Sequence, residues 1–151
     1  HEIENSNFTV GPFSIQSNYI IHPGPTIGFR VETRRGVLTY IPDHEPALGR
    51  GGLQHDINWL SGSDLASGAD VLLHDAQYTN EEYIARRGWG HSSMEDALQF
   101  AALTKVNHML LMHHDPLHSD KQLDEMYADL QAKTGYDFPF EMAVEGKVIH
   151  M

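Results

Sequence analysis

Two short runs made only of apolar residues, 71–73 and 109–112, constrain the fold more than any other feature of this sequence. A strand that shows no polar alternation is of the kind buried on both faces, as in sheets covered by other layers. Each run is followed by a helical pattern, so this part of the chain reads strand, helix, strand, helix. The order favours a layered α/β architecture.

The two helical patterns begin at recognisable start signals. Residues 92–95 and 119–122 each have the form of a capping box, with a serine followed three positions later by Glu or Gln. Apolar residues then recur at helical spacing, up to Thr104 in the first case and to a point before Gly135 in the second. We therefore predict helices over 94–104 and from 120 to just before 135.

The first 41 residues are typical of strands and turns. We predict strands at 8–10, 13–21, 26–33 and 37–41, with a hairpin turn at 34–36. Residues 46–69 are expected to form a loop with one or two short helical turns, and residues 141–144 and 147–151 a small closing hairpin. No repeat or linker divides the chain, so we predict one domain over 1–151, of class α/β (α+β mixed sheet) with helices on at least one face.

The composition excludes several classes of site and partner. The chain has 151 residues and no cysteine, so a metal must be held by histidine and carboxylate, and a cytoplasmic location is expected. The formal net charge of -11 repels a phosphate backbone, which makes nucleic acid an unlikely partner. No apolar run approaches the roughly 20 residues that span a bilayer, so no membrane partner is expected.

The placement of the eleven histidines is the strongest functional signal. Four predicted strands run directly into histidine or aspartate, at His22, at 43–44, at 74–75 and at 113–115. In layered α/β proteins, ligands bind at the carboxyl ends of strands. We therefore expect these side chains, with His91 at a helix start, to converge on one pocket.

Imidazole and carboxylate are the ligands of Zn²⁺, Mn²⁺ or Fe, and one carboxylate can bridge two cations. Asp43 is the bridging candidate. His74 backed by Asp75, and His91 at the start of a helix, are suited to meeting an anion such as phosphate. A metal-assisted reaction at a phosphate is therefore the chemistry that these residue types favour.

Other residues receive a structural interpretation. His55, His108 and His150 belong to no cluster, and His118 is a weak candidate because it stands next to a helix start. Trp59 and Trp89 are predicted to be core or loop anchors, since indoles bury large apolar areas.

Taken in order, these motifs resemble the C-terminal half of a metallo-β-lactamase-fold hydrolase of the ribonuclease Z-like and cyclic-phosphodiesterase-like branch. The matching segments are 28–32, 40–44, 69–76, 90–93 and 110–116. The resemblance implies half of a four-layer αββα sandwich that binds two divalent metal ions, with zinc favoured and manganese or iron as alternatives.

The resemblance also implies roles for individual residues. Asp43 would bridge the metals and His113 would be the last histidine ligand, with the adjacent His114 as an alternative. His74 and Asp75 would form the catalytic histidine–acid pair beside the scissile phosphate. His91 would contact the phosphate of the substrate. From their placement at strand ends, and not from the resemblance, we also expect His22 and His44 to contact the substrate.

Two departures from the family pattern affect the expected substrate. The family has a Gly-Asp-Thr turn where residues 42–44 read Pro-Asp-His, and Glu is usual where Asp75 stands. These differences favour a small or cyclic phosphodiester over transfer RNA.

The larger departure is that the His-x-His-x-Asp-His motif of the N-terminal half does not occur in these residues. We therefore expect a fragment whose metal ions are partly or wholly missing and whose isolated activity is poor. It would be completed by its N-terminal half, or form homo-oligomers through an exposed apolar face.

The sequence thus predicts a metal-dependent phosphodiesterase. Two alternatives stay open: a hydrolase of thioester, lactone or β-lactam bonds, and a non-catalytic binding or structural module of the same fold.

Overall fold

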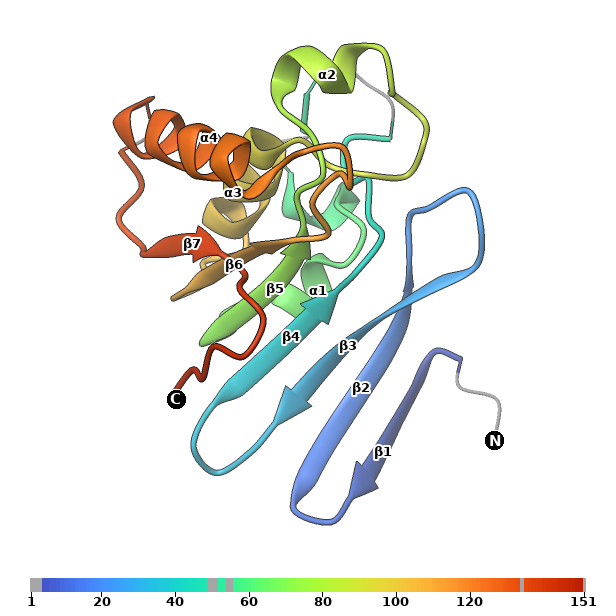
Figure 1. Ribbon diagram of the computed structural model, residues 1–151. Helices are drawn as coiled ribbons and strands as arrows, with labels where there is room; N and C mark the ends of the chain where they lie inside the picture. Colours follow the sequence, from blue (N-terminus) through green and yellow to red (C-terminus); the bar gives the residue numbers. More distant parts are fainter. Residues whose placement is uncertain (1–3, 49–51, 54–55, 134, 151) are drawn as a thin grey trace.

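The N-terminal part of the chain forms the antiparallel half of one seven-stranded sheet in the computed structural model, which describes residues 4–48, 52–53, 56–133 and 135–150 (Figure 1). Its strands are β1 (Ser6–Val10), β2 (Phe13–Ile20), β3 (Thr26–Glu32) and β4 (Val37–Ile41). Each pairs with the next in antiparallel register. The four predicted strands are confirmed with small differences at their ends, and the predicted turn at 34–36 joins β3 to β4.

The other half of the sheet is parallel. β5 (Val71–Asp75), β6 (Met109–Met112) and β7 (Phe140–Met142) follow β4, in the strand order β1 to β7. Two successive antiparallel pairings make β2 run in the same direction as β4. The carboxyl ends of β2, β4, β5 and β6 therefore lie along one edge of the sheet, the edge formed by strand ends. The mixed sheet predicted from the sequence is confirmed, and this shared edge positions the site.

Five helical segments connect the strands within the described residues. They are η1 (Ile57–Trp59), α1 (Ser63–Ala66), α2 (Asn80–Ile84), α3 (Met94–Leu103) and α4 (Asp120–Lys133). The two predicted helices are confirmed as α3 and α4, and η1 and α1 are the short turns expected in 46–69. The sequence interpretation missed α2, although Thr79 and Glu82 form a complete capping box there.

The core lies between the helices and one face of the sheet. Leu72, Met109 and Leu111 are fully buried, together with Leu65 of α1 and Phe100 of α3. The alternation of side chains along a strand explains why these three strand residues share a face. The apolar character of 71–73 and 109–112 therefore reflects burial, as predicted.

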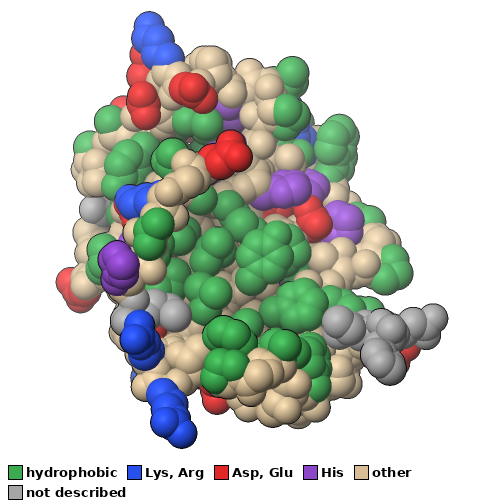
Figure 2. Space-filling model, turned by 60° about the horizontal axis from the view of Figure 1, so that its bottom comes forward, with side chains coloured by type: hydrophobic (Ala, Val, Ile, Leu, Met, Phe, Trp, Pro, Cys, Tyr) green, Lys and Arg blue, Asp and Glu red, His purple; other side chains and the backbone are tan. Residues whose placement is uncertain are grey.

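The opposite face of the sheet is also apolar. Leu38, Leu73 and Leu110 line a cavity of about 310 Å³ together with residues from 143–149, which lie over this face. Beyond that segment Tyr40, which is next to Leu73 in the register, is 40% exposed. Figure 2 shows hydrophobic side chains gathered at the centre of one face of the molecule.

The predicted C-terminal hairpin is wrong. Residues 140–142 form β7, which extends the edge of the sheet parallel to β6 instead of pairing with a following strand. Residues 147–150 form no strand, and residue 151 lies outside the described part of the chain. The side of β6 that faces away from β5 supplies the backbone partners: Met109 N–H donates to the carbonyl of Pro139, and Ala143 N–H donates to that of Leu111.

The predicted burial of the two tryptophans is also wrong. Trp59 is 76% exposed and Trp89 is 61% exposed. Each sits on a tight turn, Trp59 in η1 and Trp89 between Gly88 and Gly90, where the backbone turns at the surface. Among the described residues, no helix combines the length and apolar character needed to cross a bilayer.

Candidate functional site

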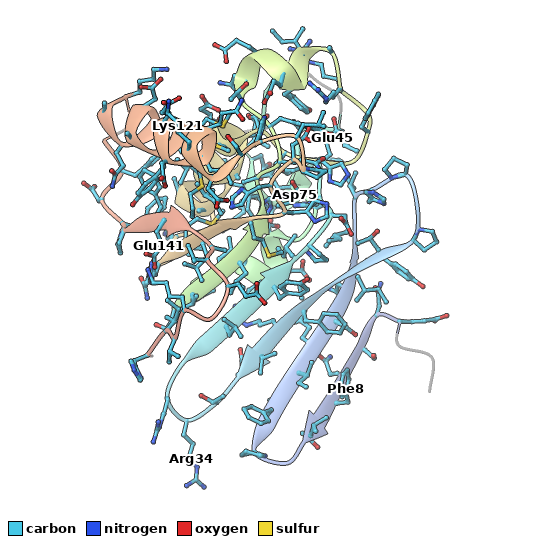
Figure 3. All side chains as sticks on the ribbon, viewed as in Figure 1. Phe8, Arg34, Glu45, Asp75, Lys121 and Glu141 are labelled. Atoms are coloured by element: carbon cyan, nitrogen blue, oxygen red, sulfur yellow. The ribbon has the colours of Figure 1, made fainter. Side chains whose placement is uncertain are left out.

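Four polar side chains meet at the edge where the like-directed strands end. Asp43 follows β4, Asp75 ends β5, His91 precedes α3 and His113 follows β6. One ligand atom from each of them lies within 4.8 Å of all the others. Figure 3 labels Asp75, which lies at the end of β5. The predicted convergence of strand ends is therefore observed for these four residues.

Asp75 is the buried centre of the cluster, with no exposed surface. Its Oδ1 accepts hydrogen bonds from the backbone N–H groups of Gln77 and Ser92, both at 3.2 Å. Its Oδ2 accepts from the N–H of His44 at 3.1 Å and from His91 Nδ1 at 2.6 Å. Four donors use the usual capacity of a carboxylate. Asp75 is thus suited to orienting His91 rather than to binding a metal openly.

His91 is held by that bond in one orientation. Because the carboxylate of Asp75 can only accept, Nδ1 of His91 carries the proton, and Nε2 is left to face other groups. Burial lowers the pKa of His91, but the hydrogen bond and charge of Asp75, with the charges of Asp43 and Glu45, outweigh burial and raise it above its ordinary value. A raised pKa favours the charged ring that an anion attracts.

Asp43 and His113 form the open part of the cluster. Asp43 Oδ1 lies 3.1 Å from His113 Nε2, and the two side chains are 33% and 39% exposed. The ring of His113 stacks on that of His91, with centroids 5.0 Å apart. This carboxylate and this imidazole are accessible and lie close together, so they are suitable ligands for a divalent cation such as zinc.

The backbone at His113 is unusual. Its φ of 61° lies in the left-handed region, which costs energy for any residue with a Cβ. The chain turns there, immediately after β6. Strain of this kind is found where a fold holds a side chain in a required place.

His74 does not reach the cluster, contrary to the prediction. Its Nδ1–H donates to the carbonyl of Asp75 at 2.6 Å, so its Nε2 accepts from His44 Nδ1 at 2.8 Å. Neighbouring residues on a strand point to opposite faces, so His74 and the Asp75 carboxylate cannot form the expected pair. The Asp75 carboxylate pairs with His91 instead.

His44 likewise cannot meet a substrate with its side chain. Both His44 and His74 are wholly buried, and their rings pack against Phe100. Burial lowers the pKa of both rings, and the neighbouring His74 lowers that of His44 further. The two histidines form a neutral pair beneath the site.

His22, the other predicted substrate contact, lies beside the cluster. Its ring meets the ring of His91 edge-on, with centroids 5.5 Å apart, and its Nδ1 accepts from the N–H of Gly24. It also packs against Gly90: a Cβ built there would lie 2.3 Å from the His22 ring. His22 therefore buttresses the segment that carries His91.

The alternative ligand, His114, is not among the four clustered residues. Both of its ring nitrogens are buried with no hydrogen-bond partner among the described residues. Burial, with the nearby His118 and His113, lowers its pKa. Of the two adjacent histidines, the geometry brings His113 to Asp43.

The remaining histidines have structural partners or lie apart. His118 Nε2 is 2.8 Å from a Glu82 carboxylate oxygen, and His108 Nε2 is 3.2 Å from Glu141. His150 is exposed, and His55 falls outside the described residues.

Sequence reasoning missed Glu45, which is 3% exposed. Its Oε1 accepts from the Tyr83 hydroxyl at 2.7 Å and from Gly88 N–H at 2.8 Å, and its Oε2 accepts from Gly90 N–H at 2.8 Å. Burial and this bond to Glu45 raise the pKa of the Tyr83 hydroxyl. Glu45 thereby fixes the segment that leads into His91. No pattern in the sequence singles it out, because its partners, one hydroxyl and two backbone N–H groups, lie 38 to 45 residues away.

Comparison with known families gives one match that covers most of the chain. A family model described as the beta-lactamase superfamily domain matches residues 1–114. The ribonuclease Z of Brevibacillus brevis is 34% identical over 76 residues, which are 50% of this chain and 24% of that protein. The ribonuclease Z of Ignicoccus hospitalis is 38% identical over 55 residues, 36% of this chain and 18% of that one. These matches span about a quarter or less of the relatives' length.

Solved structures agree on the fold. The metallo-beta-lactamase fold protein YhfI from Bacillus subtilis gives a TM-score of 0.67 at 18% identity, over 95% of this chain and 52% of that one. Zn(2+)-bound PqqB from Methylobacterium extorquens gives 0.64 at 21% identity, over 99% and 51%. The short form of human tRNase Z gives 0.58 at 24% identity, over 72% and 38%. The mixed sheet with its helices is therefore the arrangement found in about half of a metallo-beta-lactamase fold.

Proposed function

The chain belongs to the beta-lactamase superfamily, whose metallo-beta-lactamase fold indicates a metal-dependent hydrolase, and we propose that it acts on a small phosphodiester. The observation that carries this proposal is the 2.6 Å bond from His91 to the buried Asp75, next to the open pair of Asp43 and His113. It places an imidazole whose pKa is raised, and which is therefore suited to a phosphate, beside a carboxylate and an imidazole that suit a metal.

Asp43 and His113 would hold the metal, because they are the accessible carboxylate and imidazole of the cluster. A divalent ion in such a place supplies positive charge that polarises a phosphoryl oxygen and acidifies water. Zinc suits this donor set best, and manganese or iron also fit it. The role of Asp43 as a bridge between two ions is part of this proposal.

His91 would bind the substrate phosphate and donate a proton through its Nε2, because its Nδ1 is hydrogen-bonded to Asp75. In the charged ring, Nε2–H donates to a phosphate oxygen and can pass its proton to the leaving oxygen. Asp75 stabilises the charged ring and keeps its orientation. His22 would hold the ring from its other side, and the buried pair of His44 and His74 would support the strand ends without touching substrate.

The site proposed here is incomplete within this chain. With only two accessible ligands, water would have to fill most coordination positions around two metal ions. Water ligands hold the ions weakly, because the fold does not order them in advance. We propose that a preceding segment of a longer protein supplies the other ligands. The chain aligns with about half the length of solved metallo-beta-lactamase-fold proteins, which supports this.

Two observations bear on the size of the proposed substrate, and they point in opposite directions. The net charge of -11 disfavours a long nucleic acid, whereas the curated relatives are named ribonuclease Z, which sits uneasily with that expectation. A phosphodiester of nucleotide size satisfies both, because it presents one or two phosphates to a local site.

The test compares metal content and hydrolysis of bis(4-nitrophenyl) phosphate in a protein that includes the upstream segment. We expect up to two metal ions per molecule and hydrolysis, and Asp43→Asn should remove both. Asp64→Asn is the matched control, because the Asp64 carboxylate accepts hydrogen bonds from Gln16 and Asn18 on β2 and is not part of the cluster. The present chain alone should hold well under one metal ion.

The possible outcomes separate the alternatives. A longer protein that is metal-free and inert would favour a non-catalytic module. Faster cleavage of a thioester, lactone or β-lactam than of the phosphodiester would move the activity to carbonyl chemistry. Unchanged metal content in Asp43→Asn would contradict the assignment of Asp43.

A further inference from the structure

His44 is tied to Asp75 in two separate ways. Its backbone N–H donates to Asp75 Oδ2 at 3.1 Å, the same oxygen that accepts from His91 Nδ1 at 2.6 Å. Its ring Nδ1–H donates to His74 Nε2 at 2.8 Å, and His74 Nδ1–H donates to the backbone carbonyl of Asp75 at 2.6 Å. His44 is therefore connected to the carboxylate of Asp75 directly and to its main chain through His74.

A further bond joins His44 to the segment that carries His91. The Ser92 hydroxyl donates to the backbone carbonyl of His44 at 2.6 Å, and Ser92 N–H donates to Asp75 Oδ1 at 3.2 Å. Residues 44, 75 and 92 are thus each bonded to the other two, and they form a triangle of hydrogen bonds, the 44–75–92 triangle. His91 is attached to this triangle twice, by its bond to Asp75 and by its peptide bond to Ser92.

The 44–75–92 triangle is closed to water. Its three residues and His74 are each at most 1% exposed. The ring of Phe100 packs against both imidazoles, with its centroid 5.5 Å from that of His44 and 4.9 Å from that of His74. Water cannot replace a bond that is lost in such surroundings, so the groups that form these bonds stay in one arrangement.

His44 also stands directly after Asp43, the accessible carboxylate of the cluster. Consecutive Cα atoms are about 3.8 Å apart and are joined by a planar peptide unit, so a displacement of residue 44 also displaces residue 43. Through the triangle, the same displacement disturbs the bond between Asp75 and His91. His44 therefore connects the part of the site that suits a metal with the part that suits a phosphate.

We propose that His44 is a positioning residue, held through its ring by His74, that fixes His91 relative to Asp43. This rests on the proposed function, in which His91 donates a proton and Asp43 binds metal. Catalysis depends on such separations, because a displacement of about 1 Å can lower a rate roughly a hundredfold. Removing a group that orients a ligand or a catalytic side chain typically costs about 10- to 100-fold in metal affinity or activity. The buried His44–His74 pair thereby serves the reaction without touching substrate.

The first test uses this chain and needs no catalysis. The ring of His91 stacks on that of His113, so the NMR chemical shifts of its carbon-bound protons respond to any displacement between the two rings. His44→Leu removes the bond to His74 and should change these shifts. His44→Asn should largely restore them, because its amide N–H can take the place of the imidazole Nδ1–H.

His118→Leu is the matched control for this measurement. The His118 side chain is 5% exposed, and its ring bonds to Glu82 outside the triangle. The variant loses a similarly buried imidazole and should leave the His91 shifts in place. Equal changes in His44→Leu and His118→Leu, no change in His44→Leu, or shifts that His44→Asn fails to restore would overturn the proposal.

The second test measures kinetics in the longer protein at saturating metal. His44→Leu should lower kcat about 10- to 100-fold and leave KM for bis(4-nitrophenyl) phosphate unchanged, which is the pattern of an interaction lost in the transition state. Ser92→Ala should act in the same direction, because it removes the bond to the His44 carbonyl. It deletes a single oxygen atom, so it also decides the matter if His44→Leu does not fold.

Ser93→Ala is the matched control for Ser92→Ala. Ser93 is also buried, and its hydroxyl accepts from Asp96 N–H at the start of α3, outside the triangle. Each variant therefore loses one buried hydrogen bond, but only Ser92→Ala should lower kcat. Equal losses of kcat in the two serine variants, or an unchanged kcat in Ser92→Ala, would overturn the proposal.

The two tests also separate this proposal from the function on which it rests. If the His91 shifts respond as expected but the longer protein hydrolyses no phosphodiester, His44 positions His91 and the proposed hydrolase activity is wrong. If the longer protein hydrolyses the diester and the triangle variants keep the kcat of their controls, the activity is retained and the positioning role of His44 is wrong.

Discussion

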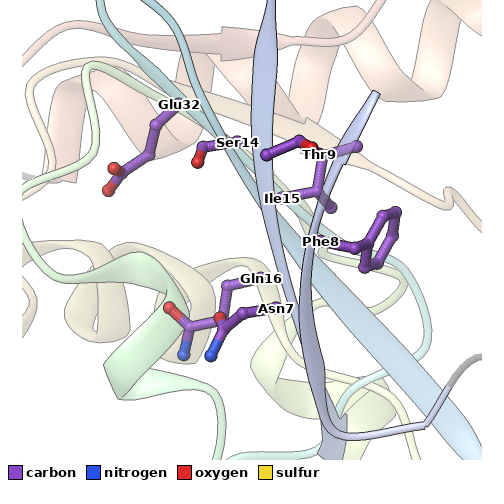
Figure 4. A pocket seen from close by; sticks show the side chains of 7 residues that line it. All are labelled: Asn7, Phe8, Thr9, Ser14, Ile15, Gln16 and Glu32. Carbon is purple, nitrogen blue, oxygen red and sulfur yellow. The ribbon is translucent and has the colours of Figure 1, made fainter. Parts of the chain in front are cut away.

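The antiparallel and parallel halves of the sheet carry very different surfaces. In the antiparallel half, residues of β1, β2 and β3 line a cavity of about 330 Å³ (Figure 4). Its lining has one carboxylate and no histidine: Asn7, Phe8, Thr9, Ser14, Ile15, Gln16 and Glu32. In the parallel half, Asp43, Asp75, His91 and His113 gather where β4, β5 and β6 end. The volume of a cavity therefore says little here about where chemistry can occur.

Strand direction explains the difference. β4, β5 and β6 run the same way, so residues that follow them meet even when they are more than 30 positions apart in sequence. In the antiparallel half, successive strand ends fall at opposite edges. His22 supports this reading, because β2 runs in the direction of β4 and delivers His22 to the ring of His91.

The largest effect that we expect is on stability, from Asp75→Ala. The change removes an acceptor of four hydrogen bonds at a site with no exposed surface and leaves buried donors without partners. The free energy of unfolding should fall by about 3–5 kcal/mol. Urea denaturation measures it, with Glu32→Gln in the cavity of the antiparallel half as the control. A loss below about 1 kcal/mol would mean that the two halves do not differ as described.

The next effect concerns turnover in the longer protein. His91→Ala should lower kcat at least about a hundredfold, or about 2.7 kcal/mol in the barrier, because the proton donor is lost. Metal content should be retained, since Asp43 and His113 stay in place. His108→Ala, whose ring pairs with Glu141 at the far edge, is the control and should leave kcat unchanged. Similar losses in both variants would argue for a general structural effect.

A pair of glycines gives an intermediate effect. Gly88 and Gly90 both have left-handed φ values, but a Cβ at Gly88 would meet nothing within 4 Å, whereas one at Gly90 would lie 2.3 Å from the His22 ring and 2.4 Å from Pro23. Gly88→Ala should destabilise the protein by about 1 kcal/mol, and Gly90→Ala by about 2–3 kcal/mol. Thermal unfolding of the two variants measures the difference. Equal losses would show that His22 does not press on this loop.

The smallest effect is expected in the cavity of the antiparallel half. Ser14 is exposed there, so Ser14→Ala should change the free energy of unfolding by less than about 0.5 kcal/mol. In the longer protein it should leave kcat and KM unchanged. A clear change in KM would locate substrate at this cavity and reverse the comparison.

Much of the fold could be predicted because periodicity and caps are local. The strands before residue 41, the buried runs and the helices after Ser93 and Ser119 all follow from such patterns. α2 was missed, although Thr79 and Glu82 carry its capping box, because its five residues are too short for a periodic pattern. The C-terminal hairpin failed because pairing of β7 depends on an edge that only the whole sheet supplies.

The candidate site could be predicted in part. The strand-end rule placed Asp43 and His113 correctly near one another, and the helix start placed His91 with them, but neither signal identified the partner of Asp75. Alternation along β5 separates His74 from the Asp75 carboxylate, and this could have been read from the sequence. The bond to His91 requires knowledge of the loop, and the role of Glu45 requires knowledge of contacts across more than 40 residues.

The left-handed backbone at His113 has an evolutionary consequence. A side chain with a Cβ costs about 1–2 kcal/mol in that conformation, which glycine adopts freely. A descendant that no longer needs this imidazole would therefore gain stability by exchanging it for glycine. The identity of the residue at this position is thus a sensitive marker of whether selection still maintains the site.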